Sequence, residues 1–197
     1  QRRKFRAPHG RCLLLLHHHH GSRPMTTTVS GDSGGTAVTT TTLPTLQGQV
    51  LQIVNYTTGT YATGTGSIPI DNTIPQNTEG DEYLSLSITP KSATSKLVIL
   101  VVLQLNVSAA QWTSVALFQD STANALASGW NYIDLATAGS NVVICHYMTS
   151  GTTSATTFKV RAAGNSGITI GINGQAGIAA RFGGTLSSSI TITEVVP

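Results

Sequence analysis

Four aromatic side chains are the residues of this chain whose types best suit ligand binding. Trp112, Trp130, Tyr132 and Tyr61 lie in or beside predicted turns, among Asn, Gln and Ser residues, in a chain where aromatic residues make up only 6%. Aromatic rings flanked by amide and hydroxyl groups suit stacking on sugar rings, with hydrogen bonds to sugar hydroxyls. We predict these four as ligand-binding residues. The alternative is that they pack under loops or between subunits.

Metal-binding and nucleophilic chemistry has few candidates. After residue 24 the chain has one histidine, His146, and one cysteine, Cys145. Neighbours on a strand point to opposite faces, so these two cannot form a nucleophile–base pair with each other. We expect Cys145 in the core and His146 at a subunit interface or core edge. They do not supply the four ligands of a zinc site unless a threefold axis joins three His146 copies, so we predict no metal and no cofactor.

Seven carboxylates are candidates for the acid pair of a glycosidase, but their spacing selects no two of them. They are Asp71, Glu79, Asp81, Glu82, Asp120, Asp134 and Glu194. The glycine-rich segments lack the lysine and the following helix of a phosphate-binding loop. We therefore predict no catalytic residues, and a protein that is not an enzyme.

The elements that must position these residues are predicted to be strands. Residues 97–103 (LVILVVL) are seven consecutive apolar residues, four of them β-branched, between turn-like segments. A strand alternates its side chains between two faces, so both faces of this one are apolar. One face of an antiparallel sandwich normally meets water. We therefore expect a neighbouring subunit to cover the second face.

Short strands with turn signals about every 8–12 residues predict an all-β fold. The segment 113–119 is expected to form a hairpin with 123–128 across residues 120–122. No segment carries a sustained 3.6-residue apolar stripe, and no repeat of fixed period indicates a β-helix or propeller. We predict an antiparallel β-sandwich or jelly roll. The other strands are expected at residues 48–56, 83–89, 141–148, 155–163, 168–172, 177–182 and 187–196.

The chain divides into three predicted segments. Residues 1–24, with six Lys and Arg, a four-histidine run and Gly-Ser, are predicted to be a vector-derived leader; the alternative is a basic arm that contacts nucleic acid. Residues 25–46, rich in Thr, Ser and Gly, are a predicted linker or tail, and residues 47–197 a β-sandwich head domain. After residue 24 the net charge is −3, which disfavours nucleic-acid binding, and no segment is long and apolar enough for membrane insertion.

Six segments, in their order and spacing, resemble the C-terminal head domain of tail-fibre and related receptor-binding proteins of tailed bacteriophages. The resemblance covers about residues 47–197. The segments are 48–52 (GQVLQ), 88–97 (ITPKSATSKL), 116–121 (ALFQDS), 156–161 (TTFKVR), the turn at Asn173 and Gly174, and 188–195 (SSITITEV).

The resemblance implies a homotrimeric fibre tip on a virion, with a jelly roll like that of the C1q and tumour-necrosis-factor heads. The expected partners are further copies of the chain, a host cell-surface glycan or protein, and other virion proteins through the N-terminal side. The family offers no ligand-binding motif to transfer. Two alternatives remain: a capsid decoration or trimerisation module that binds no ligand, and a polysaccharide hydrolase.

Overall fold

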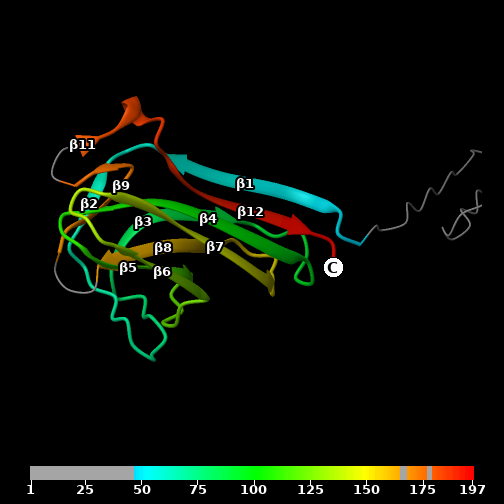
Figure 1. The fold of residues 1–197 in the computed structure, drawn as a ribbon. Helices are drawn as coiled ribbons and strands as arrows, with labels where there is room; N and C mark the ends of the chain where they lie inside the picture. Colours follow the sequence, from blue (N-terminus) through cyan, green and yellow to red (C-terminus); the bar gives the residue numbers. More distant parts are fainter. Residues whose placement is uncertain (1–46, 165–167, 177–178) are drawn as a thin grey trace, which may run out of the picture. The chain divides into compact units, whose positions relative to one another are not determined.

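The chain folds into two antiparallel β-sheets packed face to face, as predicted (Figure 1). The computed structural model describes residues 47–164, 168–176 and 179–197. The predicted leader (1–24) and linker (25–46) lie outside the described residues.

The larger sheet has the strand order β1-β12-β4-β9-β2, with β7 also paired to β4. Its strands are β1 (Val50–Thr58), β2 (Ala62–Gly64), β4 (Lys96–Val107), β7 (Gly139–Thr149), β9 (Ile170–Ile172) and β12 (Ser188–Val195). The smaller sheet has the order β3-β8-β5-β6. Its strands are β3 (Asp81–Ile88), β5 (Gln111–Gln119), β6 (Ala127–Ile133) and β8 (Thr156–Gly164). Two short strands, β10 (Gly174–Gln175) and β11 (Ala179–Ala180), pair with each other before the 3-10 turn η1 (Phe182–Gly184).

The path of the chain between the sheets is that of a jelly roll. It runs from β1 in the larger sheet to β3 in the smaller, back to β4, then to β5 and β6, to β7, to β8, and finally to β12. The paired orders β1-β12-β4-β7 and β3-β8-β5-β6 therefore interleave eight strands of two antiparallel sheets, as in double-sheet jelly rolls.

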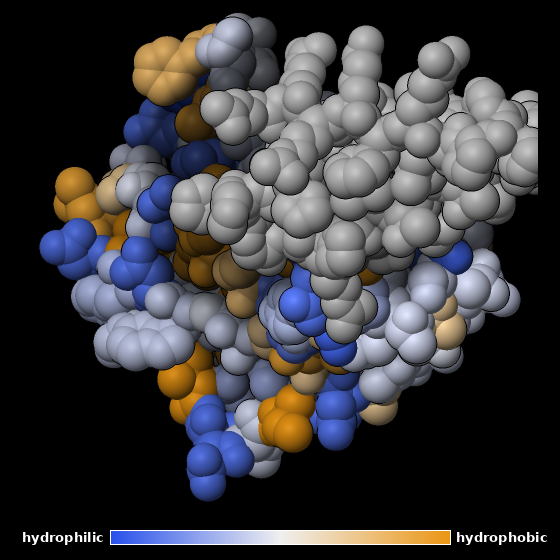
Figure 2. Space-filling view, turned by 90° about the vertical axis from the view of Figure 1, so that its right-hand side faces the viewer, coloured by the Kyte–Doolittle hydropathy of each residue, from blue (hydrophilic) through white to orange (hydrophobic). Residues whose placement is uncertain are grey.

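The outside of the molecule mixes residue types. In the view of Figure 2, hydrophobic and hydrophilic residues alternate over the area that is not grey. Among the described residues, no helix is long and apolar enough to cross a bilayer.

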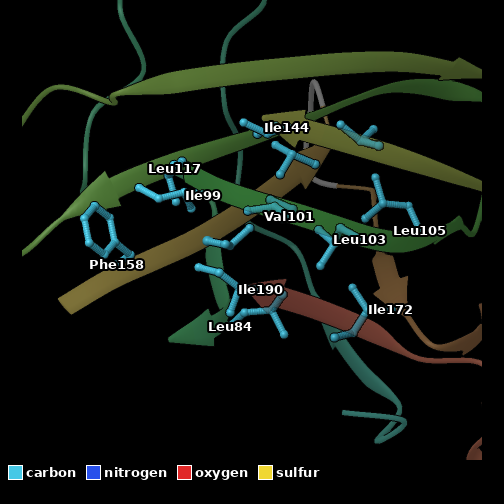
Figure 3. Close-up of a cluster of buried hydrophobic side chains, with 14 of the residues drawn as sticks. Leu84, Ile99, Val101, Leu103, Leu105, Leu117, Ile144, Phe158, Ile172 and Ile190 are labelled. Carbon is cyan, nitrogen blue, oxygen red and sulfur yellow. The ribbon is translucent and has the colours of Figure 1, made fainter. Parts of the chain in front are cut away.

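The core lies between the two sheets (Figure 3). Ile99 and Ile190 reach it from the larger sheet, and Leu84, Leu117 and Phe158 reach it from the smaller one. All five are at most 1% exposed. Full burial of a side chain of this size stabilises a fold by about 1.5–3 kcal/mol, so this alternation of apolar residues fixes which face of each strand points inward.

The central strand β4 is apolar on both faces, but the chain buries only one of them completely. Leu97, Ile99, Val101 and Leu103 point inward and are fully buried. The intervening Val98, Leu100 and Val102 point outward; Leu100 is 42% exposed and the two valines are half-buried. Within residues 47–164, 168–176 and 179–197, the second face of β4 is therefore left without a complete cover.

The hairpin after β5 differs from the prediction. The strand expected at residues 123–128 begins only at Ala127 and continues to Ile133. Residues 123–125 pair instead with the loop before β3, since the Ala125 amide donates to the Pro75 carbonyl at 2.9 Å and Asn124 forms a bridge with Gln76. The strand expected at 177–182 is also wrong in extent: its described part holds only β11 and the start of η1.

Candidate ligand-binding site

Three of the four predicted aromatic residues lie together on the smaller sheet. In the antiparallel pairing of β5 with β6, Trp112 lies opposite Tyr132, and Ser114 lies opposite Trp130. Directly paired residues share a face, so all three rings project from the outer face of the sheet. All three residues belong to strands and not to turns; Trp112 and Tyr132 lie one residue from a strand end, and Trp130 is in the middle of β6. We call Trp112, Trp130 and Tyr132 the aromatic platform.

Trp112 is the middle ring of the aromatic platform. Its centroid lies 4.6 Å from that of Trp130, at an interplanar angle of 65°, and 4.7 Å from that of Tyr132, at 56°. The rings remain accessible, because Trp112 is 37%, Tyr132 47% and Trp130 62% exposed. Edge-to-face and tilted contacts hold the rings in place while their remaining surface faces solvent.

The backbone beneath the aromatic platform is fixed by contacts on the inner side of β6. The Thr113 hydroxyl donates to the Asn131 carbonyl at 3.2 Å, and the Asn131 amide donates to the Ser140 hydroxyl on β7. Gly129 permits this close approach of β6 to β7, since a Cβ there would lie 2.9 Å from Val142 Cγ1. Contacts with β5 and β7 on the inner face of β6 therefore fix the backbone from which Trp130 and Tyr132 project.

The arrangement suits a ligand with an apolar face and polar edges. Exposed aromatic rings stack on apolar surfaces, and the Tyr132 hydroxyl and the two indole N–H groups offer hydrogen bonds. The exposed Ser128 lies two residues from Trp130 on the same face of β6. Sugar rings have this combination of a C–H face and hydroxyl edges.

Tyr61, the fourth predicted residue, lies apart from the aromatic platform. It precedes β2 at the edge of the larger sheet, and its ring packs against Gly174. Tyr61 also lies near Tyr83, where burial is the main cause that raises the pKa of the Tyr83 phenol, followed by the Asp81 and Tyr61 charges. The structure thus does not bring Tyr61 to the predicted ligand-binding group.

The positions of Cys145 and His146 correct one prediction. Cys145 was expected in the core, but it is exposed on the outer face of β7. Val142 and Ile144 take the inward positions of this strand, so the alternation places Cys145 outward and the half-buried His146 inward. Within the described ranges, no three His, Cys, Asp or Glu side chains are grouped to bind a metal ion.

Glu194 is a structural carboxylate rather than an exposed one. It is fully buried and accepts hydrogen bonds from the Ser95 hydroxyl at 2.5 Å, the Gln52 amide at 2.6 Å and the Lys91 backbone N–H at 2.8 Å. Burial raises the pKa of Glu194, but the hydrogen bonds, that of Ser95 first, outweigh burial and leave the pKa below its usual value. The sequence signal for a buried structural carboxylate is a single acidic residue in a strand whose residues alternate between buried and half-buried positions.

The comparisons with known proteins leave the family open. No protein-family model matches the chain, and no curated protein matches it. Among solved structures, dimeric latent PorU from Porphyromonas gingivalis aligns with a TM-score of 0.44 and 10% identity over 85% of this chain, which spans only 14% of that one.

Two further structures align less well. The EclA C-terminal domain, a sugar-binding protein, has a TM-score of 0.34 and 15% identity over 66% of this chain and 79% of its own. A structure of infectious bursal disease virus, Gx strain, has a TM-score of 0.33 and 10% identity over 86% of this chain and 47% of its own. All three TM-scores lie below 0.5, so these likenesses identify no family.

Proposed function

We propose that the chain is the trimeric head of a viral attachment protein, a bacteriophage fibre tip, that binds a glycan on the host surface through the aromatic platform. The observation that carries this proposal is the exposed group of Trp112, Trp130 and Tyr132, with centroids 4.6 and 4.7 Å apart on one strand pair. The resemblance of residues 47–197 to tail-fibre heads supports the viral setting, and we propose a location on the virion.

The outer face of the larger sheet supports self-association. Outward residues of β4 and β7 pair across the sheet, with Val98 opposite Tyr147, Leu100 opposite Cys145 and Val102 opposite Val143. Tyr147 is 61% and Val143 54% exposed. We call these six residues the apolar sheet face. Contiguous exposed apolar surface of this kind marks an interaction site, and further copies of the chain are the occupants we propose.

The two surfaces lie on opposite sheets of the sandwich. The apolar sheet face belongs to the outer side of the larger sheet, and the aromatic platform to the outer side of the smaller one. Trimerisation through the first would leave the second open to a ligand. Three weak glycan sites on one rigid head then gain avidity without a deep pocket.

The test is a glycan array probed with the full chain. We expect binding that is lost in Trp130→Ala, retained in part in Trp130→Phe, and unchanged in Phe182→Ala, which removes an aromatic residue 78% exposed outside the aromatic platform. Equal binding by wild type and Trp130→Ala would refute the proposed site. No binding to any glycan would favour a decoration or trimerisation module without a ligand.

The hydrolase alternative is tested on the same protein. Glu82 and Asp120 are the two carboxylates that line one pocket of the smaller sheet, but both Asp120 oxygens accept hydrogen bonds from Thr156 and Thr157 at 2.7 Å. A carboxylate held in this way serves the fold. We expect no release of oligosaccharides from host-surface polysaccharide, and release that a single carboxylate substitution abolishes would establish the hydrolase instead.

A further inference from the structure

The outer face of the smaller sheet also carries a pocket, separate from the aromatic platform. Its volume is about 280 Å³. The pocket lies between β8, the start of β3, the loop before β3 and the turn after β5. Its lining residues are Asn77, Glu82, Phe118, Asp120, Ser121, Lys159 and Arg161.

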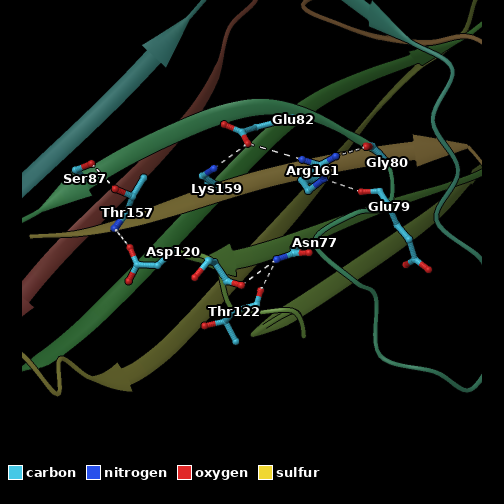
Figure 4. A network of polar contacts seen from close by, with 11 residues as sticks. Asn77, Glu79, Gly80, Glu82, Ser87, Asp120, Thr122, Thr157, Lys159 and Arg161 are labelled. Carbon is cyan, nitrogen blue, oxygen red and sulfur yellow. Dashed lines mark hydrogen bonds and ion pairs between the residues drawn. The ribbon is translucent and has the colours of Figure 1, made fainter.

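Arg161 and Asn77 hold the walls of this pocket in position (Figure 4). The Arg161 guanidinium donates from Nε to the Glu79 carbonyl at 2.7 Å and from Nη2 to the Gly80 carbonyl at 2.6 Å. The Asn77 amide donates to the Ser121 carbonyl and to the Thr122 carbonyl, each at 3.1 Å. These bonds tie the loop before β3 to β8 and to the turn after β5, so the pocket is formed before any ligand arrives.

Several polar atoms that line the pocket are left unused. The Lys159 ammonium lies 3.4 Å from Glu82 Oε2 and has further N–H groups to donate. Among the described residues, Asn77 Oδ1, Ser121 Oγ and Glu82 Oε1 have no hydrogen-bond partner. The pocket therefore presents a donor, two acceptors and a hydroxyl that both donates and accepts.

The charges of the pocket cancel. Lys159 and Arg161 supply two positive charges, and Glu82 and Asp120 supply two negative ones. The Arg161 guanidinium donates two N–H groups to backbone carbonyls and lies 3.8 Å from Glu82 Oε2, so a carboxylate already counters its charge. A phosphate, a sulfate or an acidic sugar would find no net positive charge here.

We infer that this pocket binds one uncharged sugar unit through its hydroxyl groups. Mixed donors and acceptors around a small, neutral pocket match vicinal hydroxyls, and the volume lies just below the lower end of about 300–1,000 Å³ for ligand pockets, which suits a single ring. The inference rests on the proposed function only in naming the ligand class. It assigns a second site that does not use the aromatic platform.

The register sets the second site apart from the aromatic platform. Arg161 on β8 lies two strands from Ser128 on β6, through Ala116 on β5, and Trp130 lies two residues beyond Ser128 on β6. With strands about 4.8 Å apart and a rise of about 3.4 Å per residue, Arg161 lies about 12 Å from Trp130 along the sheet. Ile68 packs in one buried cluster with Ala116 between them, so the pocket and the aromatic platform are two separate sites.

The experiment is a titration of the isotope-labelled full chain with methyl glycosides of glucose, galactose and mannose, followed by amide chemical shifts. Sulfate and N-acetylneuraminic acid serve as charged probes. We expect saturating shifts at the pocket residues with at least one neutral glycoside. Affinity should fall about threefold to tenfold in Ser121→Ala and in Lys159→Met, which each remove one hydrogen-bonding group. The matched control Ser154→Ala, an exposed serine in the loop after β7, should bind as wild type.

Shifts confined to Trp112, Trp130 and Tyr132, or equal affinity in Ser121→Ala and wild type, would overturn this inference and leave the proposed function standing. Stronger binding of sulfate or N-acetylneuraminic acid than of every neutral glycoside would also overturn it. No response to any probe would overturn it as well. The glycan array with Trp130→Ala decides the proposed function separately.

Discussion

Trp112 and Trp130, from the adjacent strands β5 and β6, lie diagonal to each other with ring centroids 4.6 Å apart. Diagonal neighbours on one face of an antiparallel pair are within reach of large side chains, and an edge-to-face aromatic pair contributes about 0.5–1.5 kcal/mol beyond its buried area. Trp112 makes a second contact of this kind with Tyr132. The middle ring therefore supports the two more exposed rings.

Replacing the middle ring should cost both stability and binding. Because Trp112→Ala removes two ring contacts, we expect the free energy of unfolding to fall by about 1–3 kcal/mol, measured by urea denaturation. Trp130→Ala, which removes one contact and a residue 62% exposed, should cost less. A larger loss in Trp130→Ala than in Trp112→Ala would contradict the assigned order of the rings.

The buried carboxylate Glu194 should make stability depend on pH. Its pKa in the folded chain lies below the usual value of 4.5, so its ionised form stabilises the fold above about pH 4.5. That contribution is lost as the pH falls through the lower folded-state pKa. We expect the melting temperature to fall on acidification below about pH 4.5 in the wild type.

A matched pair of variants isolates this effect. Glu194→Gln leaves the buried donors of Ser95 and Lys91 partly unsatisfied, so it should cost about 1–3 kcal/mol at pH 7 and weaken the acid dependence. Asp134→Asn, at an exposed residue after β6, should change neither quantity. An acid dependence that is the same in Glu194→Gln and wild type would show that other carboxylates cause it.

Cys145 offers a chemical probe of the apolar sheet face. Its thiol is exposed in a single chain and lies opposite Leu100. In a Cys12→Ser background, we expect slow maleimide labelling of the assembled protein and fast labelling once assembly is disrupted. Fast labelling at concentrations where the protein is fully assembled would place the subunit contact elsewhere.

The strands were predictable where apolar alternation is strong. Leu84, Leu86 and Ile88 share the inner face of β3, and Phe158 and Val160 that of β8, as their spacing predicted. The apolar run at residues 97–103 predicted β4 and its unusual second face. These signals are local, because the alternation of apolar and polar residues every two positions can be recognised within the strand's own sequence.

Predictions that depend on distant partners were less successful. Ala123 and Asn124 resemble strand residues, but the loop at residues 75–77 pairs with them and shifts the start of β6. That shift turns Trp130 and Tyr132 from turn residues into strand residues and brings them to Trp112. Their spacing of two residues was the available signal. The prediction that Cys145 lies in the core was wrong because the more apolar Val142 and Ile144 occupy the inward positions of β7, which turns Cys145 outward.

The most direct test is the mass of the assembled protein in solution, measured by size-exclusion chromatography with light scattering. We predict a mass three times the 20.5 kDa of one chain. Leu100→Lys, which places a charge at the centre of the apolar sheet face, should give the mass of one chain with an unchanged circular dichroism spectrum. Ser85→Lys, at an exposed position of the smaller sheet, should leave the trimer intact. A wild-type protein that elutes as a folded monomer at micromolar concentration would contradict the proposal that copies of the chain cover β4.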